Sequence, residues 1–395
     1  MNRIDELIKK LCPNGVEYRP IWSLTAWDKK FNGVDKEKQK KVISYKYYLS
    51  TDFTKVEKKN GNIKYISTGI SGDDRYTTEE LAGDYIADGE VVCIPWGGTP
   101  NVKYHKGKFV TGDNRIATSL NVNTLSNKFL YYWMQSKINV ISKFYRGSGI
   151  KHPSMKDVLD MNIAVPPLEV QCEIVHILDD FTLLSAELSA ELKARKKQYE
   201  YYKNSLLNIN GEKKKLGEIA NFKTGSKPKK IFEEKNNNYF EYINAGTTNS
   251  GYVEQANFRK NAVTTPSRGQ GGIGFVGYQT KDFWLGPLCY AIYANDDSVL
   301  NNKYLYYELS SKADEILKRK NTGGVPSLNG CDLKTIPINI PPINEQIKIV
   351  KILDKFDKLC NDISEGLPAE IEARQKQYEY YRDKLLTFKE LKVNE

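Results

Sequence analysis

Two short stretches of this chain concentrate positive charge and could neutralise phosphate groups. Residues 213–230 contain seven lysines and one glutamate, and residues 143–156 contain four basic residues and no acidic residue. Lysine and arginine side chains on loops are typical phosphate contacts in nucleic-acid-binding proteins. The whole chain has a formal net charge of +10 and a pI near 9.0, which also favours a polyanionic partner.

Polar side chains near these stretches could recognise bases directly. Arginine suits guanine, and asparagine or glutamine suits adenine, because their hydrogen-bonding groups match those base edges. Thr99, Asn101, Arg146, Arg268 and Gln270 have suitable side chains. The candidate nucleic-acid-binding residues predicted from the sequence are Trp96, Thr99, Asn101, Lys103, Arg146, Lys151, Lys223, Lys227, Lys229, Lys230, Arg268, Gln270 and Lys320.

The sequence lacks the motifs expected of a catalytic subunit. Both Pro-Pro pairs, at residues 165–168 (VPPL) and 340–343 (IPPI), lack the preceding Asn or Asp and the following aromatic residue of an amino-methyltransferase. Residues 269–274 (GQGGIG) fit the GxGxxG pattern, but a strand and turn are predicted to follow instead of the helix of a dinucleotide site. We predict a β-hairpin loop there, with glycines at positive φ.

Other cofactor and metal signatures are also missing. There is no GxxxxGK[ST] phosphate loop, and the six cysteines include no CxxC pair beside only three histidines. We therefore predict no catalytic, cofactor-binding or metal-binding residue on this chain. Nor is any apolar run long enough to span a membrane, and the start has no apolar signal core. These features and the scattered cysteines predict a cytoplasmic protein.

An internal repeat indicates the elements that must position the basic loops. Residues 165–171 (VPPLEVQ) recur as residues 340–346 (IPPINEQ), an offset of 340 − 165 = 175. Residues 194–202 (ARKKQYEYY) recur as residues 373–381 (ARQKQYEYY), an offset of 373 − 194 = 179. The second copy has therefore gained four residues.

Each copy predicts a strand followed by a long helix that starts at the prolines. A helix over residues 167–208 would be about 60 Å long at about 1.5 Å per residue, so we expect the two copies to pack against each other, antiparallel. Gly366 and Pro368 are expected to bend or interrupt the second helix. Apolar or tyrosyl residues at steps of three and four predict a coiled-coil seam, with one extra step of four in the second copy. The seam residues are Ile174, Ile177, Phe181, Leu184, Leu188, Leu192, Arg195, Tyr199, Tyr202, Leu206 and Ile209, then Ile349, Ile352, Phe356, Leu359, Ile363, Leu367, Ile371, Arg374, Tyr378, Tyr381, Leu385 and Phe388.

The segments ahead of the two helices differ in sequence but share several features. Residues 129–132 (FLYY) match residues 304–307 (YLYY), again at an offset of 175. A glycine loop precedes Pro153-Ser154 in the first segment and Pro326-Ser327 in the second. Short β-like runs at residues 90–94 and 283–292, with one helix beginning near Asn127 or Asn302, predict an α+β domain in each segment.

The predicted fold class is α+β, with two globular mixed α/β domains joined by two long antiparallel helices in a pseudo-twofold repeat. Divergence is concentrated in the domains, where binding residues are expected. The predicted organisation is an N-terminal helix at 1–12, domain 1 at 13–165, the first long helix at 166–209, domain 2 at 210–340, the second long helix at 341–388 and a tail at 389–395.

This arrangement resembles the specificity subunit of Type I restriction-modification systems over essentially the whole chain. The resemblance is carried by the paired Pro-Pro helix starts, Ile-Leu-Asp at 177–179 and 352–354, the doubled Gln-Tyr-Glu-Tyr-Tyr and the unlike domains; PSRG at 266–269 and FVGY at 275–278 also look like that family. It implies two target-recognition domains that each read half of a bipartite duplex DNA site. It also implies that the helices dock two methyltransferase subunits. The predicted docking and coiled-coil residues are Phe181, Leu188, Leu192, Tyr199, Tyr202, Phe356, Ile371, Tyr378 and Tyr381.

The same resemblance assigns the chemistry to other chains. S-adenosylmethionine, ATP and Mg²⁺ are expected on the partner subunits, and restriction subunits are expected to join through the methyltransferase subunits. The tandem tetrad at residues 185–192 (SAELSAEL) resembles the short repeats that the family carries in its first central helix. Two other functions stay open from the residues alone: a coiled-coil RNA-binding or scaffold protein, and a stand-alone DNA methyltransferase or nuclease with unrecognised motifs.

Overall fold

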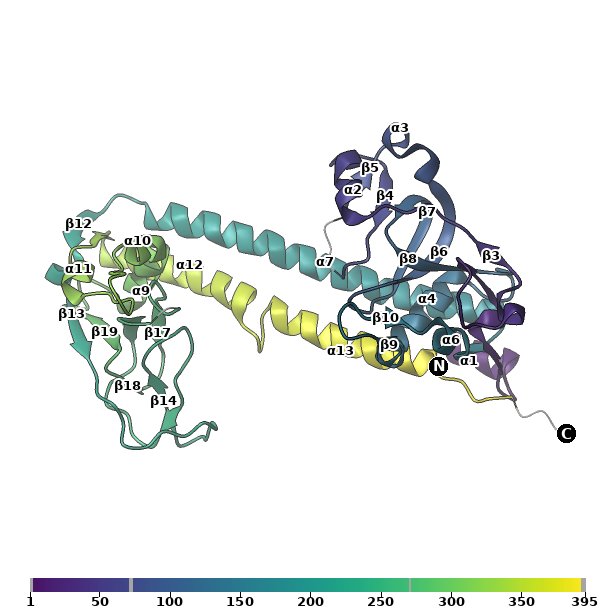
Figure 1. Ribbon diagram of the computed structural model, residues 1–395. Coiled ribbons are helices and arrows are strands. Elements are labelled where there is room, and N and C mark those ends of the chain that lie inside the picture. The colour runs from purple at the N-terminus through teal and green to yellow at the C-terminus, as the bar shows by residue number, and fades with distance from the viewer. Residues whose placement is uncertain (1–2, 71–73, 270, 392–395) are drawn as a thin grey trace. The chain divides into compact units, whose positions relative to one another are not determined.

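The chain is organised as two units, each of which holds one globular domain and a segment of both long-helix copies. The computed structural model describes residues 3–70, 74–269 and 271–391. Unit 1 comprises Met1–Glu187 and Ile371–Glu395, and unit 2 comprises Leu188–Glu370. Figure 1 shows the course of the chain through both units. Within the described part of the chain, no helix is long and apolar enough to cross a membrane.

Unit 1 is built around a seven-stranded sheet that follows α1 (Arg3–Leu11). Its centre is antiparallel, because β6 pairs antiparallel with both β7 and β8. β6 contains the run predicted at residues 90–94, and Val92 and Ile94 on it have no exposed surface. In spatial order the strands are β3 (Val42–Ile43), β2 (Thr25–Asp28), β8 (Asn114–Ser119), β6 (Ala87–Pro95), β7 (Lys103–Thr111), β4 (Ile63–Ile66) and β5 (Tyr76–Thr77).

Helices and short strands complete domain 1. α4 (Asn127–Ser136) begins where a helix was predicted, because the Ser126 side chain caps it by accepting from the backbone N–H of Phe129. β11 (Asn162–Val165) pairs antiparallel with β1 (Glu17–Pro20), so the two ends of the domain meet. The remaining elements are α2 (Ser50–Val56), α3 (Glu79–Ala82), α5 (Ile138–Lys143), β9 (Tyr145–Arg146), β10 (His152–Pro153), α6 (Met155–Leu159) and 3-10 turns at Ile21–Ser23, Lys36–Gln39 and Gly83–Tyr85.

Domain 2 in unit 2 contains two sheets. A four-stranded sheet has the order β13 (Ala220–Thr224), β19 (Cys289–Ala294), β16 (Ala262–Pro266) and β17 (Gly277–Gln279), and a three-stranded sheet has the order β15 (Tyr252–Val253), β14 (Phe240–Ile243) and β18 (Phe283–Leu285). β12 (Glu212–Lys215) pairs antiparallel with β20 (Pro337–Ile340), which closes this domain as β1 and β11 close domain 1. The helices are α8 (Leu216–Ile219), α9 (Asn302–Ser311), α10 (Ala313–Lys318) and α11 (Gly330–Lys334).

One strand prediction in domain 2 was wrong. The run predicted at residues 283–292 is two strands in different sheets, β18 and β19, with a turn between them. Proline at position 287 cannot donate a ladder hydrogen bond. The N–H of Gly286 donates to the Ile243 carbonyl (2.7 Å), and the N–H of Leu288 donates to the Asn244 side chain (3.0 Å), so the chain turns away from the first sheet.

The two domains share one strand arrangement, which confirms the α+β repeat. The order β2-β8-β6-β7 in domain 1 corresponds to β13-β19-β16-β17 in domain 2, and every neighbouring pair is antiparallel in both. α4 and α9 begin at Asn127 and Asn302, so their offset is 302 − 127 = 175. The hairpin predicted at the GQGGIG loop is present, because β17 follows β16 antiparallel and the Gly269 and Gly274 φ angles are +116° and +97°.

The long helices pair in antiparallel order, as predicted. α7 (Leu168–Leu207) spans 40 residues, and the second copy consists of α12 (Ile343–Asn361) and α13 (Leu367–Leu385). In unit 1, the Phe181 ring stacks on Tyr381 with centroids 5.6 Å apart. In unit 2, the Tyr199 and Tyr202 rings lie 6.2 and 5.5 Å from that of Phe356. Later residues of α7 thus pair with earlier residues of the second copy (Figure 1).

The predicted interruption of the second helix is present at residues 362–366, which are not helical. A Cβ atom at Gly366 would lie 2.5 Å from the Lys358 carbonyl oxygen and 2.6 Å from that of Asp362, so only glycine fits this turn. Asp362 also accepts hydrogen bonds from the backbone N–H groups of Ser364 and Glu365. The four residues gained by the second copy therefore lie beside a turn between helices.

The predicted seam of the second copy is wrong in this region. Ile363 is 81% exposed and lies in the turn, and Ile352 and Leu359 are 40% and 37% exposed. The buried residues are instead Leu353 and Cys360, which have no exposed surface and belong to the domain 2 core. α12 thus directs its apolar face toward its own domain as well as toward α7, and no extra helical step of four continues the seam.

The first residues of the predicted tail have defined backbone contacts. Residues 389–391 are held in unit 1, because the N–H of Val16 donates to the Lys389 carbonyl and the N–H of Leu391 donates to the Val16 carbonyl, both at 2.9 Å. The Tyr18 hydroxyl donates to the Phe388 carbonyl at 2.9 Å. The beginning of domain 1 therefore binds the end of the second helix copy through backbone pairing, which apolar periodicity does not reveal.

Candidate nucleic-acid interface

Each domain is fixed to its long helix by a buried glutamine. Gln171 accepts a hydrogen bond from the backbone N–H of Ser126 (2.9 Å) and donates to the carbonyls of Thr124 and Pro166 (both 2.8 Å). Gln346 makes the equivalent three hydrogen bonds in unit 2, at 2.9, 2.8 and 2.8 Å. Neither glutamine has exposed surface. The repeated Pro-Pro…Gln motif therefore sets the loop before α4 or α9 against the helix start.

A phenol–carboxylate pair forms a second anchor in each unit. The Tyr132 hydroxyl donates to Asp179 on α7 at 2.5 Å, and the Lys128 ammonium lies 2.7 Å from the same carboxylate. In unit 2 the equivalent hydroxyl and ammonium lie 2.6 and 2.9 Å from Asp354. Burial and the adjacent carboxylate raise the pKa of Tyr132, so its hydroxyl stays protonated as a donor.

A hairpin and a strand-end loop form one surface on each domain. In domain 1 the backbone N–H of Gly98 donates to the Lys151 carbonyl at 3.1 Å, and in domain 2 that of Gly269 donates to the Pro326 carbonyl at 3.1 Å. The two acceptors are related by 326 − 151 = 175. We call residues 96–101 with 146–152 the first hairpin surface, and residues 267–269 with 321–327 the second hairpin surface.

The alignment of the two hairpins differs from the predicted one. The sequence paired Pro153-Ser154 with Pro326-Ser327, but the backbone pairs Arg146 with His152 and Asn321 with Ser327. The offset of 175 therefore continues through the hairpin, and His152 corresponds to Ser327. Backbone pairing determines this register. The two Pro-Ser pairs are related by an offset of 326 − 153 = 173, which is two residues less than the structural offset of 175.

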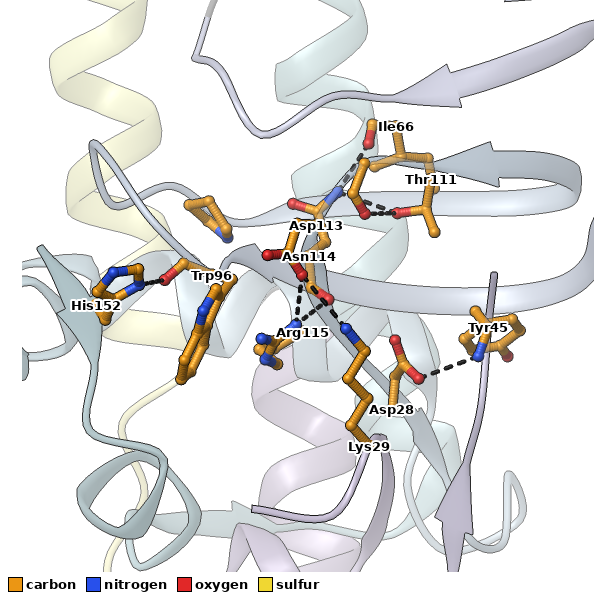
Figure 2. A network of polar contacts seen from close by, with 12 residues as sticks. Asp28, Lys29, Tyr45, Ile66, Trp96, Thr111, Asp113, Asn114, Arg115 and His152 are labelled. Carbon is orange, nitrogen blue, oxygen red and sulfur yellow. Dashed lines mark hydrogen bonds and ion pairs between the residues drawn. The ribbon is translucent and has the colours of Figure 1, made fainter. Parts of the chain in front are cut away.

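Trp96, on the first hairpin surface, lies between the side chains of Arg115 and His152 (Figure 2). The Arg115 guanidinium lies 3.9 Å from the centroid of its ring, and the His152 ring lies 5.0 Å away on centroids. Nδ1 of His152 is 2.8 Å from the Trp96 carbonyl oxygen, and because a carbonyl only accepts, Nδ1 carries the proton. Stacking and this hydrogen bond together hold the loop and hairpin in one position.

A network of ion pairs holds the Arg115 side chain against Trp96. The Asp113 carboxylate accepts from the Arg115 guanidinium at 2.9 Å, and the Lys29 ammonium lies 3.5 Å from it. The Arg115 side chain is only 6% exposed, so it positions Trp96 and Asp113. Lys29 follows β2 at a φ of +68°, which directs the chain out of the sheet.

Two buried polar residues complete the network in Figure 2. The Asn114 amide donates to the Ile66 carbonyl at 2.7 Å and to the Thr111 hydroxyl at 3.1 Å. Asp28 is 2% exposed and accepts from the backbone N–H of Tyr45 at 3.1 Å. Desolvation raises the pKa of Asp28. These contacts make the base of the first hairpin surface rigid.

The structure separates the predicted residues of domain 1 into exposed and internal groups. Thr99, Arg146 and Lys151 are exposed on the first hairpin surface, and Arg146 lies 3.1 Å from the Asp157 carboxylate. Asn101 instead donates to the carbonyls of Thr68 and Thr99, both at 3.0 Å.

Lys103 is also held inside domain 1. Its ammonium donates to the Ser67 carbonyl at 2.6 Å and lies 3.1 Å from the Ser67 hydroxyl. Burial lowers the pKa of Lys103 because its charged form is desolvated. Lys103 therefore positions the strand next to the surface, as Asn101 positions the loop.

In domain 2, the register brings together predicted residues that are far apart in sequence. Tyr290 on β19 pairs with Thr224 on one side and with Thr265 on the other. Lys223 on β13 and Arg268 just after β16, both exposed, therefore lie at the same end of the sheet, on the two strands that flank β19. Lys227, Lys229 and Lys230 are exposed on the loop after β13, Lys320 is half-buried before the hairpin, and Gln270 lies outside the described residues.

Equivalent positions in the two domains carry unlike side chains. Arg115 pairs with Ile94 on β6, and Tyr290, at 290 − 115 = 175, pairs with Thr265 on the corresponding β16. The stacked arginine of the first surface is thus a tyrosine in the second. Arg115, His152 and Lys29 were not among the predicted site residues. Arg115 lies in a buried strand, so no sequence pattern distinguishes it from a structural residue.

Comparison with known proteins identifies the family. A family model described as "Type I restriction modification DNA specificity domain" matches residues 42–195 and 208–373. The chain belongs to this family. It is 35% identical to a Type I restriction enzyme specificity subunit of Escherichia coli over 302 residues, 69% of this chain and 74% of that protein. A specificity-subunit relative from Haemophilus influenzae is 31% identical over 83% of this chain and 89% of its own length.

The fold agrees with this assignment. The crystal structure of a Type I restriction-modification S subunit from M. genitalium matches with a TM-score of 0.67 and 20% identity, and covers 94% of this chain and 96% of that one. The chain is therefore a DNA specificity subunit and is non-catalytic, as the sequence predicted. Membership of this family decides against the two other functions that the residues left open, an RNA-binding scaffold and a stand-alone enzyme. The two family matches cover both hairpin surfaces.

Proposed function

We propose that each domain reads one half of a bipartite duplex DNA site through its hairpin surface. The observation that carries this proposal is the contrast between identical anchors and unlike surfaces. Gln171 and Gln346 hold their domains in the same way, whereas the exposed Arg146 of the first hairpin surface is replaced by Asn321 at the equivalent position of the second. Like scaffolds with unlike side chains present different hydrogen-bonding patterns, so they suit two different half-sites.

The charges of the surfaces support a duplex partner. Arg146 and Lys151 on the first surface, and Lys223 and Arg268 at the second, are exposed where they can reach phosphates or base edges. Trp96 and Thr99 lie in the same loop as Gly97 and Gly98, the two glycines that contact the hairpin. In this proposal Arg115 and Lys103 are positioning residues, and the exposed set makes the contacts.

The long helices would dock two methyltransferase subunits, one for each repeat. Tyr201 and Tyr380 support this, because they are related by the offset of 179 and are 69% and 63% exposed. Large exposed aromatic side chains at equivalent positions suit a partner that binds twice. The predicted docking residues Tyr199 and Phe356 contact each other and so hold the helices together in unit 2.

The remaining partners follow from this assembly. S-adenosylmethionine would bind the methyltransferase subunits, and ATP with Mg²⁺ would bind restriction subunits that join through them. Among the described residues there is no group of three or more His, Cys, Asp or Glu side chains placed to hold a metal ion. The proposed location of the assembly is the cytoplasm, where its DNA substrate would be.

Sequencing of DNA methylation tests the proposal. The chain would be expressed with its methyltransferase subunits in a strain that lacks other methylation systems. The expected result is one methylated motif with two defined halves and an undefined spacer. A continuous motif, or methylation that persists when this chain is omitted, would contradict it. Arg268→Ala in domain 2 should then make the methylated sequence less specific in one half of the motif. Val122→Ala alters an exposed loop of domain 1 outside the hairpin surface and should change neither half.

A further inference from the structure

One exposed aliphatic side chain lies at the same place in both hairpins. Ile150 is 70% exposed and Val325 is 75% exposed, and they are related by 325 − 150 = 175. Both are β-branched and follow a glycine. Burial of such a side chain is favourable because its apolar surface leaves water. Two equally placed, solvent-exposed aliphatic side chains therefore indicate a partner that covers both.

Each side chain is held in position by its hairpin. Ile150 lies against Gly97, where a Cβ atom would be 2.8 Å from the Ile150 Cγ2 atom. Gly147 allows the turn with a φ of +141°, since its Cβ would lie 2.9 Å from the Ile150 carbonyl oxygen. The first hairpin is also tied to the neighbouring loop by the hydrogen bond from Gly98. Ile150 is thus presented outward on a constrained turn.

The second hairpin presents Val325 in the same way. Asn321 and Ser327 exchange both backbone hydrogen bonds across its base, at 2.8 and 3.2 Å. Gly324 has a φ of +122°, and Pro326, which has a restricted backbone, follows the valine. The Pro326 carbonyl accepts from Gly269, so this turn is also tied to its strand-end loop.

The surroundings of both tips favour DNA as the partner. Residues 143–156 hold four basic residues and no acidic residue, and Lys318, Arg319 and Lys320 directly precede the second hairpin. Arg319 contacts Glu315 and Thr335, and Arg146 contacts Asp157, so the other basic side chains carry most of the uncompensated charge. An apolar tip among basic side chains suits a duplex, whose phosphates flank an apolar stack of bases.

The shared residue type indicates a role that does not depend on base sequence. A side chain that reads a base should differ between domains that read different half-sites, as the exposed and equivalent residues Arg146 and Asn321 do. Ile150 and Val325 are instead alike in shape and polarity. Aliphatic side chains that enter DNA act as wedges, because they separate neighbouring base pairs and bend the duplex.

We propose that Ile150 and Val325 are DNA wedges, each of which inserts into the base stack of its own half-site. This inference rests on the proposed half-site reading. A base next to an opened step has lost part of its stacking and is extruded at lower cost. The wedges therefore prepare each half-site for a partner that must turn out a base before modifying it.

The test uses the full chain with its methyltransferase subunits and duplexes that carry 2-aminopurine at successive positions of the methylated motif. Unstacking of this base raises its fluorescence. The wild-type complex should raise it at one step in each half-site. Ile150→Thr keeps the branch at Cβ but replaces the ethyl group by a hydroxyl, and should abolish the rise in one half only. Val325→Thr should abolish it in the other half.

Affinity and salt dependence separate a wedge from a charge contact. Each threonine variant should bind the duplex about tenfold more weakly, with the same dependence on salt, because no charge is removed. Lys151→Ala, in contrast, removes an exposed charge of the first hairpin and should reduce the salt dependence by about one phosphate contact. Val122→Thr makes the same chemical change at a 54% exposed valine in unit 1 and should behave as wild type.

Three results would overturn the proposal. The first is a fluorescence rise in the threonine variants equal to that of the wild type. The second is weaker DNA binding without any change in fluorescence, which would indicate a groove contact. The third is weaker binding of the methyltransferase subunits in the absence of DNA, which would indicate a protein interface. If the wild-type complex recognises no bipartite site at all, the proposed function itself fails.

Discussion

At the scale of single residues, contacts between each domain and its helix explain why the same residue types recur at equivalent positions of the two repeats. Tyr132 and Lys128 meet Asp179 in unit 1, and their counterparts meet Asp354 in unit 2. Tyr132 and Asp179 are separated by 47 residues, yet they form one partly buried hydrogen bond. Hydrogen bonds from a neutral donor to a charged acceptor are stronger than those between neutral groups.

Removal of the Tyr132 hydroxyl tests this anchor. Tyr132→Phe leaves Oδ1 of Asp179 without this donor, while Lys128 stays on Oδ2, and should lower the free energy of unfolding by about 1.5–3 kcal/mol. Tyr131→Phe is the matched control, because the structure records no hydrogen bond of that hydroxyl to a described residue. Urea denaturation followed by fluorescence measures both variants. Equal destabilisation by the two substitutions would show that the hydroxyl of Tyr132 does not anchor the helix.

The tyrosine pKa values predict alkaline sensitivity. Burial raises the pKa of Tyr131 to about 12, and burial with nearby carboxylates raises those of Tyr132 and Tyr307 further. A raised pKa in the folded state stabilises the fold below the ordinary tyrosine pKa of about 10 and loses that contribution as the pH rises through the folded value. The free energy of unfolding should therefore fall above about pH 10. Urea denaturation at a series of pH values measures this, and a free energy of unfolding that stays constant between about pH 9 and pH 12 would contradict the prediction.

At the scale of elements, the two copies of the long helix differ in continuity. α7 is unbroken over 40 residues, whereas the second copy has a turn at residues 362–366. The tandem tetrad at residues 185–192 is entirely helical, and the division between the two units falls within it, after Glu187. A helical segment at this position can set the separation of two domains, because helix length grows uniformly with residue number.

Insertion of one further Ser-Ala-Glu-Leu tetrad tests whether this segment is a ruler. Four residues add about 6 Å of helix and a net rotation of roughly 40°. DNA rises by about 3.4 Å and turns by about 35° per base pair, so the spacer should lengthen by one or two base pairs while both half-sites stay the same. Methylation sequencing with the partner subunits measures this. An unchanged spacer in an active complex would rule the ruler out, and insertion of the tetrad after Asn361 in the turn is a control.

At the scale of the whole molecule, the chain consists of two domains that close upon themselves. β1 pairs with β11 in domain 1, and β12 pairs with β20 in domain 2, just before each long helix. Each domain has its own buried core and its own glutamine anchor. Such closure predicts that one domain can be replaced without disturbing the other.

Exchange of residues 13–164 for the corresponding segment of another specificity subunit tests this modularity. The new domain keeps the strand pair at its base and meets the same Gln171, so the assembly should form. Only one half of the methylated motif should change, because the second hairpin surface is untouched. A change in both halves, or in neither while methylation continues, would refute independent reading by the two domains.

The amino-acid sequence alone was enough to predict the repeat, the long helices, their antiparallel order, the starts of α4 and α9 and the glycine hairpin after β16. These features arise from local periodicity, caps and turns, or from two copies of one motif, so residues that are close together in the sequence are enough to predict them. Tertiary structure decided that Arg115 stacks on Trp96, that Lys103 turns inward and that Ile363 leaves the seam. Those outcomes depend on strands and helices that are distant in sequence, because burial and pairing are settled only when remote segments pack together.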